Sequence, residues 1–212
     1  MIETTYIYST DNSGLLAWLQ ANAVPTYFDS VVADETTPST IHCYTGEHEL
    51  LTISIPNASK PSVGFTVKNA VGTTNSCTYG YAGYYAWYGY KCAGGLAISA
   101  GTGSAQYIPV FITKDSSGNT TVISSTQIST QKAAYPISCA DVVTTLLSIS
   151  TETTTGAAAT TMVPFVCGNG VGETRYTPNA FYMPTAQYSG IGKLMIDGVA
   201  YLSNGAWLLK DQ

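Results

Sequence analysis

Two turn dipeptides near the C-terminus constrain the fold of this chain more than any other feature. Asp197-Gly198 follows the apolar run 194–196 and precedes a second apolar run at 199–202, after which Asn204-Gly205 leads into a third at 206–209. Asp-Gly and Asn-Gly favour the type I′ turn, because both central residues of that turn need a positive φ, and this turn joins antiparallel strands. Two such turns in succession predict a three-stranded meander.

The preceding residues are also typical of short strands. Candidate strands cover residues 27–32, 40–44, 50–55 and 64–68, with breaks at Pro38, Gly46, Pro56 and Pro61. A hairpin is expected between residues 107–113 and 120–128, and residues 140–149 fit either a short helix or a strand. One short helix is predicted after the possible N-caps at residues 11–13, with an apolar face at 15–19 and an end at Pro25. We therefore expect an all-β domain, mainly an antiparallel sandwich or barrel, with one or two short helices.

Composition and charge exclude several classes of protein. Charged residues make up 10% of the 212 residues and apolar residues 45%, which argues against intrinsic disorder and against a coiled coil. The net charge is −5 and Arg175 is the only arginine, so binding to nucleic acid through phosphate contacts is not expected. No apolar run is long enough for membrane insertion. The N-terminus lacks the features of a secretory signal, so we expect the chain to be made in a cytoplasm.

Catalytic and metal-binding patterns are weak. His42 and His48 are the only histidines, and Cys43, Glu47 and Glu49 lie near them, but the spacing fits no Cys/His zinc pattern. We interpret this segment as a polar hairpin tip around the turn at Gly46. Nucleophile-elbow and phosphate-loop motifs are absent from the sequence. We therefore expect no enzyme activity, no cofactor and no metal, although a hydrolase using Glu47 or Glu49 stays open because a sequence does not show which side chains converge.

The most unusual segment is rich in tyrosine and runs from Cys77 to Tyr90. If the segment formed one strand, its aromatic side chains would alternate between the two faces. One face would carry Tyr79, Tyr81, Tyr85 and Trp87, and the other would carry Tyr84, Tyr88 and Tyr90. Rings with a polar tip suit glycan platforms and subunit interfaces, and they also suit ordinary packing on a core. These seven residues are our candidate ligand or partner contacts, and all three interpretations stay open.

Residues 1–13 are predicted to form an extended N-terminal arm, and residues 14–212 a single β-rich domain. The candidate assembly contacts of the arm are Ile2, Tyr6 and Tyr8, because an extended strand can pair with a neighbouring subunit by strand addition. The five cysteines are odd in number and widely spread, so we expect reduced, buried thiols. Cys77 and Cys92 flank the tyrosine-rich segment and could pair in an oxidising setting.

The last quarter of the chain resembles a known class of proteins. The resemblance rests on residues 161–168 (TMVPFVCG), 176–184 (YTPNAFYMP) and 192–205 (GKLMIDGVAYLSNG). These segments look like the C-terminal ends of small virion structural proteins from tailed phages and prophages of gut Gram-positive bacteria. The resemblance implies a capsid decoration, head-fibre or tail-associated protein that is multimeric and assembled in the host cytoplasm. It carries over no functional residue.

Two hypotheses follow from the sequence. The first is a bacteriophage virion structural protein on the particle surface, which associates with itself and with other virion proteins through the N-terminal arm and the C-terminal meander. The alternative is a carbohydrate-binding adhesin or receptor-binding module, in which the tyrosine-rich segment stacks on a host surface glycan.

Overall fold

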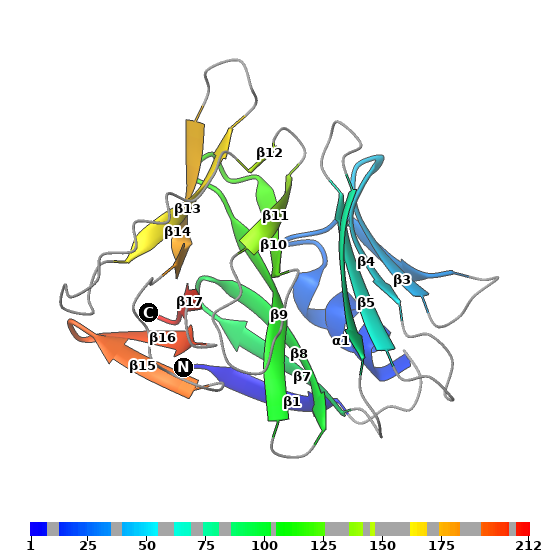
Figure 1. The fold of residues 1–212 in the computed structure, drawn as a ribbon, viewed down its shortest axis with the longest axis horizontal. Coiled ribbons are helices and arrows are strands. Elements are labelled where there is room, and N and C mark those ends of the chain that lie inside the picture. Colours follow the sequence, from blue (N-terminus) through cyan, green and yellow to red (C-terminus); the bar gives the residue numbers. More distant parts are fainter. Residues whose placement is uncertain are drawn as a thin grey trace.

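The structure is a computed structural model that describes residues 1–7, 13–34, 40–54, 62–68, 74–80, 86–102, 105–125, 136–141, 145–146, 162–168, 174–182, 192–203 and 207–212. Within these residues the chain forms three antiparallel sheets and one helix (Figure 1). The helix, α1, comprises Ser13–Ala23 and lies where the sequence predicts it. The prediction of an all-β antiparallel fold is confirmed.

We name the three sheets by their place in the molecule. The central sheet has the order β1 (Glu3–Ile7), β7 (Ala86–Cys92), β8 (Gly95–Thr102), β9 (Ala105–Lys114), β10 (Thr120–Ser125) and β11 (Pro136–Asp141). The helix-side sheet has the order β2 (Ser30–Ala33), β3 (Thr40–Thr45), β4 (His48–Ser54), β5 (Ser62–Lys68) and β6 (Thr74–Gly80). The C-terminal sheet has the order β12 (Thr145–Leu146), β13 (Val163–Gly168), β14 (Thr174–Tyr182), β17 (Trp207–Lys210), β16 (Val199–Ser203) and β15 (Gly192–Ile196).

The central sheet is buried on both faces. In β9, Val110 and Ile112 belong to one apolar cluster, whereas Phe111 between them belongs to another. Neighbouring side chains of a strand point to opposite faces, so the two clusters lie on opposite sides of the sheet. Strands buried on both faces have continuous apolar runs instead of alternation. The central sheet is thus the middle layer between the other two sheets (Figure 1).

The larger cluster, which we call the helix-side core, lies between the central sheet, α1 and the helix-side sheet. Leu15 and Leu19 of α1 and Phe28 in the loop that follows are completely buried in it. Phe65 of β5 packs edge-to-face on Trp87 of β7, with ring centroids 6.1 Å apart. These rings come from two different sheets, so the core joins them directly.

The smaller cluster, the C-terminal core, lies between the central and C-terminal sheets. Phe111 and Ile123 of the central sheet face Phe165, Leu202 and Leu209 of the C-terminal sheet, and all five side chains are buried. This apolar cluster is smaller than the helix-side core. Polar contacts between the two sheets supplement it.

The predicted hairpins are confirmed. β9 and β10 pair from Lys114 opposite Thr120 onward. β15 and β16 pair up to Ile196 opposite Val199, with Asp197 and Gly198 at φ values of 49° and 80°, as a type I′ turn requires. β16 also pairs with β17, which completes the predicted meander. Asn204-Gly205 lies outside the described residues. The undecided segment 140–149 contributes the end of β11 and the short strand β12.

Candidate assembly surfaces and buried polar contacts

The tyrosine-rich segment is divided between two sheets. Its first part belongs to β6 of the helix-side sheet and its last part to β7 of the central sheet. The segment is therefore not one continuous strand, because the chain passes from one layer to another between Gly80 and Ala86. Tyr81, Tyr84 and Tyr85 lie outside the described residues, and nothing is described of the Tyr79 side chain.

The three described aromatic residues of β7 are placed mainly by packing. Trp87 is completely buried in the helix-side core, and Tyr90 is 5% exposed in the C-terminal core. Tyr88 is half-buried and packs on the C-terminal core. Trp87 thus lies on the face opposite to Tyr88 and Tyr90, as alternation predicts. Trp87 and Tyr90 have no ring face open to a ligand, which corrects their assignment as contact residues.

The N-terminal segment pairs within its own chain. β1 lies antiparallel to β7, with Glu3 opposite Lys91 and Ile7 opposite Trp87. Ile7 is buried in the helix-side core, and Ile2 packs on the C-terminal core. The segment is extended, as expected, but β7 and the two cores fix it in place as a strand of the domain. Nothing is described of the Tyr6 side chain, and Tyr8 lies outside the described residues.

β15 is an open edge of the C-terminal sheet. It pairs with β16 on one side and has no neighbour on the other among the strands that the structure describes. Lys193 is exposed, and Met195, at 56% exposure, is one of the few large apolar side chains exposed in the described chain. Leu194 and Ile196 point to the other face, where they pack on Tyr201 and Leu208. Among the described strands, the predicted C-terminal meander therefore ends in a strand that is paired on one side only and carries an exposed apolar side chain.

The polar hairpin tip around Gly46 is confirmed. Thr45 pairs with His48 across the turn, and the Gly46 amide donates to Asp29 Oδ2 at 2.6 Å. His42 Nδ1 lies 2.5 Å from Glu49 Oε1, and the Thr52 hydroxyl donates to the same oxygen at 2.7 Å. Among the described residues, no group of three or more His, Cys, Asp or Glu side chains is placed to hold a metal ion. His42 and Glu49 thus serve as partners for each other.

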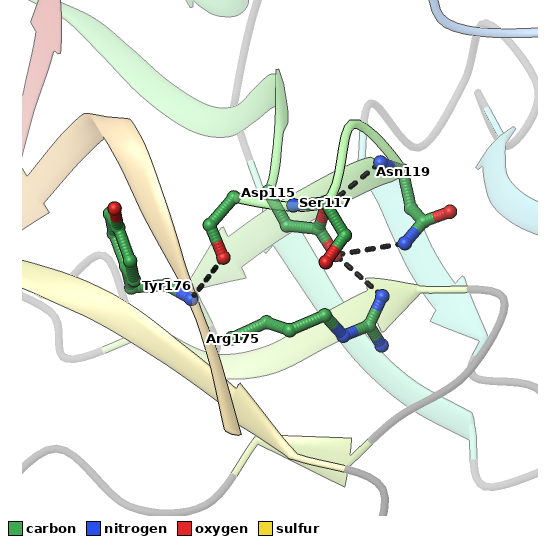
Figure 2. A network of polar contacts seen from close by, with 6 residues as sticks. Asp115, Ser117, Asn119, Arg175 and Tyr176 are labelled. Carbon is green, nitrogen blue, oxygen red and sulfur yellow. Dashed lines mark hydrogen bonds and ion pairs between the residues drawn. The ribbon is translucent and has the colours of Figure 1, made fainter. Parts of the chain in front are cut away.

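A buried ion pair joins the central and C-terminal sheets, and sequence reasoning missed it. Arg175 Nη1 of β14 donates to Asp115 Oδ2 at 2.6 Å, and both residues are 3% exposed (Figure 2). Asp115 begins the β9–β10 turn, 60 residues earlier in the chain. The available signals were the single arginine of the chain and an Asp at the start of a Ser/Gly/Asn turn. Neither signal identifies the other residue as its partner.

Asp115 also organises its own turn. Its Oδ1 accepts hydrogen bonds from the Ser117 and Asn119 amides, both at 2.8 Å, and its Oδ2 accepts one from the Asn119 side chain (Figure 2). Such bonds to nearby amides are characteristic of Asp in turns. The Ser116 amide donates to the Tyr176 carbonyl at 2.7 Å. The turn is therefore fixed both internally and against β14.

Cys43 and Cys92 are free and buried. Cys43 lies in the helix-side core and Cys92 in the C-terminal core. Because Cys92 is a free thiol, the Cys77–Cys92 disulfide that the spacing allowed is not formed. Burial raises the pKa of Cys92 to about 12, the Asp211 carboxylate also raises it, and the N-terminal ammonium lowers it. This ammonium lies 3.3 Å from Asp211 Oδ1.

Comparisons with known proteins found no match for the chain. No family model matches it, and no curated protein matches it either. None of the helical structure in the described part of the chain has the length and apolarity of a membrane span.

Proposed function

We propose that this chain is a bacteriophage virion structural protein of the particle surface, which works by self-association and by docking to other virion proteins. The observation that supports this most strongly is the open edge at β15. On the side away from β16, β15 has no described neighbour. The Met195 side chain of this strand is 56% exposed. An unprotected edge strand is a template for pairing with another chain, and an exposed apolar side chain adds buried area on pairing.

The position of the resemblance in the fold supports the same proposal. The three tracts that resemble phage virion proteins correspond to β13, β14 and the β15–β16 hairpin, which all belong to the C-terminal sheet. The resemblance therefore covers one structural unit. This unit includes the open edge, so the resemblance and the exposed strand point to the same part of the molecule.

The internal contacts fit a protein that works as a scaffold. The buried charges of Asp115 and Arg175 hold two layers together, and the Glu49 carboxylate is engaged by His42 and Thr52. A stack of three sheets with buried polar links gives a rigid body, and rigid bodies lose little conformational entropy on assembly. A capsid decoration, head-fibre or tail-associated role is compatible with such a body.

Light scattering of the purified full chain over a wide concentration range tests self-association. We expect a defined oligomer whose population rises with concentration, and a monomer at every concentration would contradict the proposal. Antibodies raised against the purified protein then test the location. We expect them to label the exterior of phage particles released from cells that encode the chain, and labelling confined to cell debris would contradict a virion role.

A further inference from the structure

The backbone groups of β15 divide into an inner and an outer set. Ile196 and Val199 flank a two-residue turn, so they form a hydrogen-bonded pair, and the pattern then alternates along the strand. Ile196, Leu194 and Gly192 therefore direct their amide and carbonyl groups to β16. Lys193 and Met195 direct theirs to the open side. The free edge thus offers two N–H and two C=O groups from two residues that are both exposed.

These outward groups match a second copy of the same strand. When two β15 strands lie antiparallel about a two-fold axis at Leu194, Lys193 of each copy lies opposite Met195 of the other. Both of these pairs are of the hydrogen-bonded kind, so four N–H···O=C bonds form and every outward group of the two residues finds a partner. The two Leu194 side chains then meet on the face that carries Tyr201 and Leu208, which extends this apolar surface across the interface.

The lysine on the edge favours the antiparallel arrangement. A lysine on an edge strand normally discourages pairing. In the antiparallel arrangement Lys193 of one copy lies opposite Met195 of the other, and the two lysines are only diagonal neighbours. A parallel arrangement in register would place the two lysines directly opposite each other.

We infer that β15 pairs with β15 of a second copy of this chain, antiparallel and centred on Leu194, and this inference rests on the self-association in the proposed function. The result is one continuous sheet made from the two C-terminal sheets. The pairing uses backbone bonds and the Met195 and Leu194 side chains. It requires no change in β16 or in the layers behind it.

Met195→Pro tests the backbone bonds. Proline removes the outward amide of Met195 while the inner bonds to β16 stay intact, and a strand edge tolerates proline in this position. Two of the four intermolecular bonds are lost, so we expect the dissociation constant measured by light scattering to rise about tenfold or more. Met195→Val is the matched control, because it keeps the amide and places an apolar, β-branched side chain that suits a strand. We expect it to associate nearly as the parent chain does.

A charge variant tests the same interface without altering the backbone. In an equimolar mixture of the parent chain and Lys193→Glu, the two diagonal side chains at position 193 carry opposite charges. We therefore expect the mixture to associate more strongly at low salt than either protein alone at the same total concentration. Equal association of the mixture and the two separate proteins would overturn the charge argument.

Cysteine variants test the register. Under mild oxidation Leu194→Cys is expected to form a disulfide-linked dimer, because the two residues at position 194 face each other directly. Lys193→Cys is the matched control, since its two copies are offset along the strands and lie too far apart for a disulfide. Crosslinking of position 193 in preference to 194 would overturn the register.

The outcomes separate this inference from the proposed function. A parent chain that is monomeric at every concentration contradicts both. An oligomer that is unaffected by Met195→Pro and shows no preference for mixed association with Lys193→Glu leaves self-association in place and overturns the role of β15. Circular dichroism and the thermal midpoint of each variant show whether the domain is folded, and Lys193→Glu carries the test if Met195→Pro is unfolded.

Discussion

The two cores of this protein hold the central sheet to its neighbours in different ways. The helix-side core is made from large apolar side chains that interlock across the layers, with Phe28, Phe65 and Trp87 completely buried. The C-terminal core has a smaller apolar cluster and is bordered by polar contacts, among them the Asp115–Arg175 pair. Hydrophobic burial tolerates small shifts because it is non-directional, whereas hydrogen bonds fix orientation.

The polar contacts of the C-terminal core lie at the ends of hairpins. The Gly94 amide, in the β7–β8 turn, donates to the Lys210 carbonyl at 2.9 Å. The Ser116 amide, in the β9–β10 turn, donates to the Tyr176 carbonyl. Each of these two turns of the central sheet thus bonds a strand of the C-terminal sheet. The difference between the cores indicates that the C-terminal sheet, which carries the open β15 edge, is held in a defined orientation by few directional contacts.

The largest effect is expected from Arg175→Met. This change leaves the buried Asp115 carboxylate without its cationic partner, and breaking a buried pair from one side costs about 3–5 kcal/mol. We expect the free energy of unfolding, measured with urea, to fall by about this amount. A loss of less than about 1 kcal/mol would show that the ion pair does not hold the C-terminal sheet in place.

The control for Arg175→Met is the double variant Asp115→Asn/Arg175→Met. The introduced amide oxygen can still accept the hydrogen bonds from the Ser117 and Asn119 amides, and the buried charge is gone. We expect this double variant to be more stable than Arg175→Met alone. A double variant that is less stable would mean that Asp115 contributes through the turn more than through the pair.

A second test compares one glycine from each core. A Cβ at Gly94 would lie 2.6 Å from Asn179 Cβ and 2.8 Å from the Lys210 carbonyl oxygen, so Gly94→Ala pushes two sheets apart. A Cβ at Gly89 would lie 2.2 Å from Trp18 Cε2, so Gly89→Ala pushes on α1. Overpacking of this kind costs about 1–3 kcal/mol.

Hydrogen exchange distinguishes the two glycine variants. We expect Gly94→Ala to speed amide exchange in β14 and β17, and Gly89→Ala to speed it in α1 and β7. The same exchange pattern in both variants would contradict the division into two separate cores.

The sequence predicts local elements of this fold better than it predicts contacts between them. The Asp197-Gly198 turn, the β9–β10 hairpin and α1 follow from short-range turn chemistry and apolar spacing, and all three are confirmed. The layer order is a long-range property. The tyrosine-rich segment shows the difference, because the alternation considered for it holds within β7, whereas the segment as a whole is divided between two sheets.

The candidate sites follow the same rule. The open edge at β15 belongs to the predicted meander, so its existence is a local inference. The Asp115–Arg175 pair joins residues 60 positions apart, and no local pattern relates them. Trp87 looked like a contact residue because the composition around it is typical of binding surfaces, but aromatic rings are equally suited to cores. Only the packing of β7 against Phe65 decides between the two roles.

Alkaline pH is expected to weaken the C-terminal core. Burial raises the pKa of the Cys92 thiol to about 12, and burial together with Tyr88 raises the pKa of Tyr90 to about 12. Both groups are therefore protonated in the folded state at a pH where the unfolded chain has begun to lose these protons. The contribution of these two groups to the free energy of unfolding is complete below about pH 9 and is lost as the pH rises toward 12.

The free energy of unfolding measured between pH 8 and pH 11 tests this expectation. We expect it to fall with rising pH, with a shallower slope for Cys92→Ala than for the parent chain. A parent curve that is flat over this range would contradict the burial of these two groups.

The smallest effect is expected from alanine at two turn glycines, Gly46 and Gly118. Gly46 and Gly118 have φ values of 58° and 86°, and a Cβ at either position would meet no heavy atom within 4 Å. Alanine therefore costs about 1 kcal/mol at each site through backbone strain alone. The Gly118 turn also places Asp115 against Arg175, so we expect Gly118→Ala to cost more than Gly46→Ala. In an Arg175→Met background the two costs are expected to become equal, and an unchanged difference would show that the turn and the ion pair act independently.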